Sequence, residues 1–166
     1  MHIEQLSDTY TVRRMTKEDI PAMLRLCRGN PQFYRYCPPA PDEDGLREDL
    51  SALPPGKVMQ DKYYIGYFDG ERLIALMDLI DGYPAADTAF IGFFMVEAAL
   101  QGAGRGSALI GELTDCLRKW GYRAIRLGWV EGNAQSEGFW HKNGFRETGV
   151  RADTGEYTII VAEKQL

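Results

Sequence analysis

The chain has 166 residues, of which 45% are hydrophobic and 26% charged, and its formal net charge at pH 7 is −5. This length and composition predict one compact domain over residues 1–166 and exclude a disordered or fibrous chain. Acidic and basic residues are interspersed, so no broad positive surface for nucleic acid is expected. The longest apolar run, Ala89 to Val96, falls far short of the roughly 20 residues that a membrane helix needs.

The N-terminus and the cysteines indicate a cytoplasmic protein. Residues 1–9 lack the basic start and apolar run of a secretory signal. Cys27, Cys37 and Cys116 are odd in number and widely spaced, without a CxxC pair. We therefore expect reduced thiols, and neither these cysteines nor the two histidines suggest a metal site.

The first sixty residues predict one short strand and two helices. Residues 10–14 can begin a strand. Thr16 and Asp19 have the spacing of a capping box, and the apolar residues that follow recur at helical spacing until Gly29-Asn30-Pro31. A second helix is expected over residues 42–53, where it lies between two proline-rich stretches.

The remaining residues predict alternating strands and helices. Asp69-Gly70 is a strong signal for a two-residue hairpin turn, so the flanking strands should pair antiparallel. The expected elements, in chain order, are strands 63–68, 72–80 and 89–96, a helix from Gly104 to Gly121, strand 124–130, helix 133–143, and a closing hairpin of strands 145–151 and 157–163. The order predicts an α/β protein whose central apolar strand feeds directly into a helix.

A glycine-rich loop stands at that junction between strand and helix. Its residues are Gln101, Gly102, Ala103, Gly104, Arg105, Gly106 and Ser107. Unpaired amides at a helix N-terminus attract anions, and glycine lets a polyphosphate approach the backbone closely. The dinucleotide pattern GxGxxG fails because position 107 is Ser107, and the Walker pattern fails because no Gly-Lys-Ser/Thr follows.

Gln101, Gly104 and Gly106 resemble the acetyl-CoA signature of the GNAT superfamily of N-acetyltransferases. The resemblance continues through Asn133, Ser136, Phe139, Trp140 and Gly144-Phe145, and covers residues 63–151. It implies a mixed, mostly antiparallel central sheet flanked by helices. It also implies acetyl-CoA as co-substrate, with no metal, and direct transfer of the acetyl group without a covalent enzyme intermediate.

The same resemblance implies which residues bind the co-substrate. The loop 101–107 would hold the pyrophosphate, with Arg105 adding a charge. Met95 and Val96 lie where the family pairs its splayed strand with the pantetheine arm, and a backbone N–H there could stabilise the oxyanion. Asn133 lies where the family contacts that arm, although asparagine there could equally serve as a helix N-cap.

The acid and the base are harder to assign. Trp140 occupies the position where many family members have a tyrosine acid, and an indole N–H is no proton donor at neutral pH, although its ring can pack on the cofactor. Asp78, within an apolar strand, and Glu97, after the central strand, are the candidate bases, and a chain of water molecules is the alternative.

The acceptor is expected to be an amine on a small molecule or a peptide. The residues that could recognise it are Phe33, Tyr34, Tyr36 and the acidic run Asp42, Glu43, Asp44, which could equally cover the core and open a helix. Two other functions stay open: a catalytically degenerate acyl-CoA-binding or regulatory module, and a site for another phosphate ligand such as a nucleotide. The sequence does not decide the oligomeric state, a homodimer included.

Overall fold

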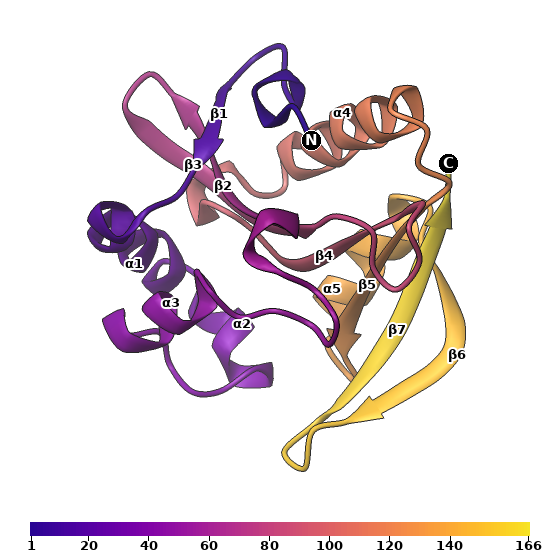
Figure 1. The fold of residues 1–166 in the computed structure, drawn as a ribbon. Coiled ribbons are helices and arrows are strands. Elements are labelled where there is room, and N and C mark those ends of the chain that lie inside the picture. Colours follow the sequence, from indigo (N-terminus) through magenta and orange to yellow (C-terminus); the bar gives the residue numbers. More distant parts are fainter.

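The computed structural model describes residues 1–166 and contains one sheet of seven strands in the order β1-β2-β3-β4-β5-β7-β6 (Figure 1). The strands are β1 (Thr11–Arg14), β2 (Lys62–Asp69), β3 (Arg72–Ile80), β4 (Thr88–Val96), β5 (Ala124–Val130), β6 (Arg146–Asp153) and β7 (Thr158–Gln165). Only β4 and β5 run parallel. The expected mixed, mostly antiparallel sheet flanked by helices is confirmed.

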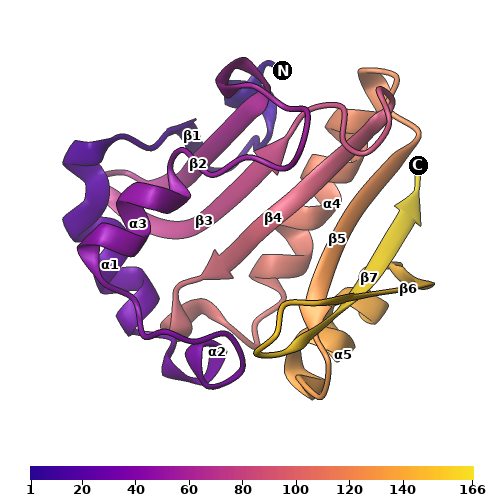
Figure 2. The same cartoon turned by 60° about the horizontal axis from the view of Figure 1, so that its bottom comes forward.

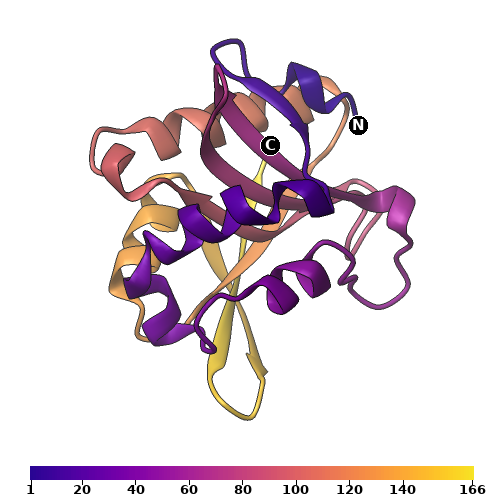
Figure 3. The same cartoon turned by 90° about the vertical axis from the view of Figure 1, so that its left-hand side faces the viewer.

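Helices cover both faces of the sheet (Figure 2). They are α1 (Ile20–Arg28), α2 (Pro31–Tyr36), α3 (Glu43–Asp49), α4 (Arg105–Lys119) and α5 (Ala134–Lys142). The layer formed by α1 to α3 faces the viewer in Figure 3, and α4 and α5 lie on the other side of the sheet. None of the helices has the length and apolar character needed to cross a bilayer.

Each helical layer buries its own apolar core against the sheet. Leu109, Ile110, Leu113 and Leu117 recur at helical spacing in α4 and are fully buried. They pack against the side chains that alternate strand residues place on that face. A second, smaller core lies under α1 and α3. The α1–α3 layer and the α4–α5 layer therefore clamp the central strands from opposite sides.

The helical region before β2 differs from the sequence prediction. Pro31 was expected only to stop α1, but it also begins α2, because proline fits the first turn of a helix, where no N–H is needed. The helix expected over residues 42–53 covers only Glu43–Asp49. Asp42 caps it by accepting a 2.8 Å hydrogen bond from the Gly45 amide.

β4 and β5 diverge after a short paired stretch. Their register begins at Thr88 and Ala124 and ends at Ile91 and Leu127. The next residue of β4, Gly92, has no partner in β3 either, because the β3–β4 register shifts there. This β-bulge bends the strand, and in Figure 2 the two strands separate toward the end of β4. The divergence opens the sheet at its centre.

Candidate functional site

A cleft of about 600 Å³ occupies the opening between β4 and β5. The last residues of both strands form its walls, with Ile91 to Val96 on one side and Leu127 to Val130 on the other. The glycine loop, α5 and the residues around the start of α2 also line it, and the loop meets the start of α2 where Gln101 donates to Asn30. Residues far apart in the sequence therefore line one cleft.

The glycine loop presents a row of backbone donors at the start of α4. The N–H groups of residues 102 to 107 donate to no acceptor in the protein, and the first amide of this segment with a partner is that of Ala108, which donates to the Gly104 carbonyl. Gly102 and Gly104 have φ of +78° and +79°, a conformation that favours glycine, and a Cβ at either position would meet no atom within 4 Å. The loop is thus a concave, positively polarised surface suited to a polyphosphate.

Two loop side chains are engaged elsewhere in the protein. Arg105 donates to the Tyr10 hydroxyl at 2.6 Å and does not line the cleft, and Ala103 does not line it either. Gln101 lines the cleft, but its Nε2 donates to Asn30 Oδ1 at 2.6 Å and to the Val96 carbonyl at 2.8 Å. The donors that this loop offers to the cleft are therefore its backbone N–H groups and the hydroxyl of Ser107, which also lines the cleft.

The main chain of β4 offers donors to the cleft at Val96, as expected, and at Phe94 in place of Met95. The Glu97 amide donates to the Ile74 carbonyl, so the two-residue alternation of an antiparallel ladder pairs Met95 with β3. The N–H groups of Phe94 and Val96 then point toward the opening. The sequence pattern missed Phe94, because it does not show which edge of the strand each amide faces.

Asn133 and Trp140 of the α5 region both line the cleft. Asn133 Oδ1 accepts from the Ser136 amide at 3.1 Å, so the N-cap role is present, while the residue also borders the cleft. Trp140 is 7% exposed and packs against Phe139 and Phe145, with ring centroids 4.9 and 5.1 Å apart. These two residues form part of the wall that α5 and its N-cap contribute, together with Phe139.

The two candidate bases, Asp78 and Glu97, do not line the cleft. Glu97 forms an ion pair with the exposed Arg72 guanidinium at 2.7 Å. Asp78 Oδ2 accepts a 2.8 Å hydrogen bond from Lys62, which is 1% exposed. Burial raises the pKa of Asp78, and the Lys62 ammonium partly offsets this.

Asp78 nevertheless lies directly behind a cleft residue. Its Oδ2 is 2.8 Å from the place that a Cβ of Gly92 would take, and Gly92 lines the cleft. Tyr64 is its cross-strand partner, and both Tyr64 Oη and Asp78 Oδ1 are buried without a hydrogen-bond partner. Buried polar atoms are seldom left unpaired, so each of these two atoms is suited to bind an ordered water molecule.

Of the residues expected to recognise the acceptor, Phe33 is the one that lines the cleft; Tyr34, Tyr36 and the acidic run do not. The sequence missed Cys37, which lines the cleft beside α2 and lies 3.4 Å from the Tyr157 hydroxyl. This contact raises the pKa of Tyr157 to about 12. It joins α2 to the segment between β6 and β7 across one end of the cleft.

Comparisons with known proteins identify the class to which this fold and cleft belong. The family model described as Acetyltransferase (GNAT) family matches residues 27–145. The chain therefore belongs to the GNAT acetyltransferase family. No curated protein matches the sequence significantly.

Solved structures of acetyltransferases share the fold. An acetyltransferase from Thermus thermophilus is 21% identical, with a TM-score of 0.76 and full coverage of both chains. A GCN5-related N-acetyltransferase from Kribbella flavida is 24% identical, with a TM-score of 0.66 over 96% of this chain and 99% of that one. The PaiA N-acetyltransferase of Thermoplasma acidophilum, solved in complex with coenzyme A, is 18% identical, with a TM-score of 0.67 over 95% and 99% of the two chains.

Proposed function

We propose that this protein is an acetyl-CoA-dependent N-acetyltransferase that acetylates a primary amine on a small molecule or a peptide. The observation that carries the proposal is the row of unpaired N–H groups from Gly102 to Ser107 at one end of the cleft between β4 and β5. Family membership supports the reaction class. The neighbour solved with coenzyme A supports the choice of co-substrate.

The cleft suits an acyl-CoA in shape and in donor chemistry. Its polar end would bind the pyrophosphate through the loop amides, because the open space beside Gly102 and Gly104 leaves the backbone accessible. Asn133 and the free edge of β4 would hold the pantetheine arm, and Trp140 would pack against it. Bound acetyl-CoA supplies an activated thioester carbonyl.

The protein's part in the chemistry is to orient the thioester and stabilise charge. The N–H groups of Phe94 and Val96 face the opening and would donate to the carbonyl oxygen as an amine attacks. The amine attacks the carbonyl carbon, the C–S bond breaks, and CoA leaves as a thiolate that takes up a proton. No side chain of the protein carries the acetyl group in this scheme.

The attacking amine must lose a proton, and we propose that Asp78 receives it. Asp78 lies behind Gly92, which lines the cleft, and an ordered water molecule bound to its free Oδ1 would relay the proton. Burial raises the pKa of Asp78, which makes its carboxylate a better proton acceptor. Glu97 has less support, because it is paired with Arg72 and does not line the cleft.

One observation favours the alternative of an acyl-CoA-binding module without turnover. The residues that line the cleft include no carboxylate, histidine or tyrosine. A degenerate relative would keep the unpaired N–H groups of the glycine loop. It would lack a group that accepts the proton of the attacking amine. The two functions differ only in turnover, so binding and turnover must be measured separately.

The test is a calorimetric titration of the protein with acetyl-CoA, CoA and ATP, followed by thiol-release assays on a panel of primary amines and peptides. Binding that requires the pantetheine arm, together with turnover of at least one amine, is the expected result. Binding without turnover would favour the regulatory module. Equal binding of ATP would favour a nucleotide site, and no binding at millimolar ligand would overturn the assignment of the loop.

A further inference from the structure

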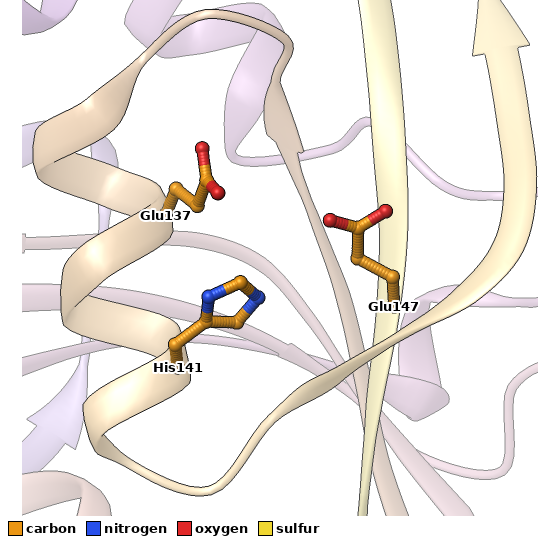
Figure 4. Close-up of side chains that lie close together, drawn as sticks. All are labelled: Glu137, His141 and Glu147. Atoms are coloured by element: carbon orange, nitrogen blue, oxygen red, sulfur yellow. The ribbon is translucent and has the colours of Figure 1, made fainter.

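A second cluster of functional side chains lies on the side of α5 that faces β6, away from the cleft. It consists of Glu137 and His141 of α5 and Glu147 of β6 (Figure 4). One ligand atom from each residue lies within 4.8 Å of the other two. Figure 4 shows the imidazole and both carboxylates pointing into the same space between the helix and the strand. None of the three residues lines the cleft.

The local fold explains why these side chains meet. Glu137 and His141 are four residues apart on α5, so they project from the same side of the helix. Gly144, with φ of +89°, turns the chain after α5 and leads it into β6, which brings Glu147 back alongside. The His141 ring stands edge-on to Trp129, with centroids 5.3 Å apart and planes at 89°, which restricts its rotation.

The ligand atoms of this cluster are largely free of protein partners. Arg151 Nη2 donates to Glu147 Oε2 at 2.9 Å, which leaves Oε1 free. Arg146 contacts the backbone carbonyl of His141 and does not reach its ring. Glu137 and His141 are half-buried, so these polar groups face one another with reduced access to water. Two carboxylates and one imidazole, with one carboxylate also paired to Arg151, are a ligand set that suits a divalent cation.

We propose that Glu137, His141 and Glu147 form a binding site for a divalent transition-metal ion of the Zn²⁺ class. Imidazole nitrogen and carboxylate oxygen are ordinary zinc ligands, and a tetrahedral ion with bonds of about 2.1 Å places its ligand atoms about 3.4 Å apart. The three ligand atoms, now within 4.8 Å of one another, would have to move closer by side-chain rotation to reach that separation. A water molecule would complete the coordination, as in zinc sites with three protein ligands.

The proposed ion would tie α5 to the start of β6. Phe139, on the opposite side of the same helix, and Trp140, next to His141 in the sequence, both line the cleft. A metal bridge would therefore hold one wall of the cleft against the β6–β7 hairpin. The site does not depend on acetyl transfer, and its test needs neither acetyl-CoA nor an acceptor.

The experiment is a calorimetric titration of the full chain with Zn²⁺ under reducing conditions, carried out in a His2→Ala background. That background removes the exposed His2–Glu4 pair, whose ligand atoms lie 3.6 Å apart and could bind metal independently. Glu137→Gln and Glu147→Gln keep the side-chain shape, so their folding should be preserved. Glu131→Gln is the matched control, because Glu131 contacts the same Arg151, at 3.7 Å, but lies outside the cluster.

We expect one Zn²⁺ per chain and at least about tenfold weaker binding in each of the two cluster variants, with the control unchanged. Arg151→Gln should bind as tightly as the parent or more tightly, because it removes a positive charge beside the ion. Co²⁺ should quench fluorescence in the parent and lose this effect in Trp129→Phe, because Trp129 contacts His141. Absence of Zn²⁺ binding at millimolar concentration, or equal binding by the cluster variants, would overturn the proposal.

Discussion

Gln101 and Asn30, which lie 71 positions apart in the chain, are joined by a 2.6 Å hydrogen bond from Gln101 Nε2 to Asn30 Oδ1. Both side-chain amides also donate to the Val96 carbonyl, at 2.8 Å from Gln101 and 3.3 Å from Asn30. Asn30 is 9% exposed and donates further to the Leu26 carbonyl. This contact fixes the end of β4, the end of α1 and the start of the glycine loop relative to one another.

Gln101→Ala should therefore lower both stability and acetyl-CoA affinity, because Gln101 holds the glycine loop in position. It leaves the buried Asn30 oxygen without its donor, so we expect a loss of about 1 to 2 kcal/mol in the free energy of unfolding, measured by urea denaturation. Acetyl-CoA affinity should fall as well, because the loop loses its anchor. A double-mutant cycle with Asn30→Ala should give a coupling of at least about 0.5 kcal/mol; additive effects would contradict the role of the pair.

Gly104 allows a test, with a closely matched control, of whether the unpaired N–H groups of the glycine loop bind acetyl-CoA. Gly104 and Gly121, the residue that follows α4 and its C-cap, have φ of +79° and +88°, and a Cβ at either position meets nothing within 4 Å. Alanine at each should destabilise the fold to a similar extent, about 1 to 2 kcal/mol, by strain. Only Gly104→Ala should weaken acetyl-CoA binding in a calorimetric titration, by more than about tenfold. Equal affinities would show that the phosphates bind elsewhere.

Much of this architecture could be predicted from local patterns. The Asp69-Gly70 pair predicts the β2–β3 hairpin, although the two turn residues are Gly70 and Glu71 because Asp69 still pairs with Arg72. The apolar spacing from Leu109 to Leu117 predicts α4. Both signals depend on nearby residues. The sequence also placed the glycine loop at a junction of strand and helix, where the structure has it. Its role in binding the co-substrate stays a prediction.

What the sequence could not predict depends on irregular pairing. Counting from the observed Asp69–Arg72 pair sets Tyr64 opposite Met77, but a bulge at Tyr67 and Phe68 moves its partner to Asp78. A second bulge leaves Gly92 unpaired, and this brings Asp78 up behind the cleft wall. Bulges arise from tertiary packing and leave no reliable local signal, so neither Tyr64 nor Gly92 was identified as part of the site.

Replacing Asp78 and Glu97 one at a time by the isosteric amide shows which of the two carboxylates is the base. Asp78→Asn should lower turnover of the best amine found in the panel by at least about a hundredfold with little change in acetyl-CoA affinity, whereas Glu97→Gln should leave both nearly unchanged. The single Asp78 variant leaves Lys62 buried without its partner, so Asp78→Asn combined with Lys62→Gln is the second variant. Tyr64→Phe should fold normally and turn over more slowly. Full activity in Asp78→Asn would exclude it as the base.

The pH profile gives a further check on the same residue. Asp78 must be ionised to accept a proton, and burial raises its pKa, so turnover should fall as the pH drops through that raised value. The charged and titratable groups that act on Asp78 are Lys62 on β2 and Asp49 on α3, and its neighbour Tyr64 is in turn close to Cys27 of α1 and Tyr34 of α2. The acidic limb should disappear in the Asp78 variants and persist in Glu97→Gln.

The ion pair between Arg13 and Asp19 should make the free energy of unfolding depend on pH. Two 2.8 Å hydrogen bonds from the Arg13 guanidinium lower the pKa of Asp19 to about 2, against about 3.9 in an unfolded chain. A lowered pKa stabilises the folded state above about pH 4, and this contribution is lost as the pH falls through about 2. Because the Arg13 side chain is 47% exposed, solvent screening limits the effect to about 1 kcal/mol.

Arg13→Gln should therefore be less stable than the parent above pH 4, and the difference should shrink as the pH approaches 2, as measured by denaturation at a series of pH values. A small part that does not depend on pH should remain, because Arg13 also lies 4.3 Å from the centre of the Phe68 ring. Arg123→Gln is the control, since Arg123 is 83% exposed and 3.6 Å from Asp87. If the Arg13 difference stayed constant from pH 6 to pH 2, the ion pair would not be its source.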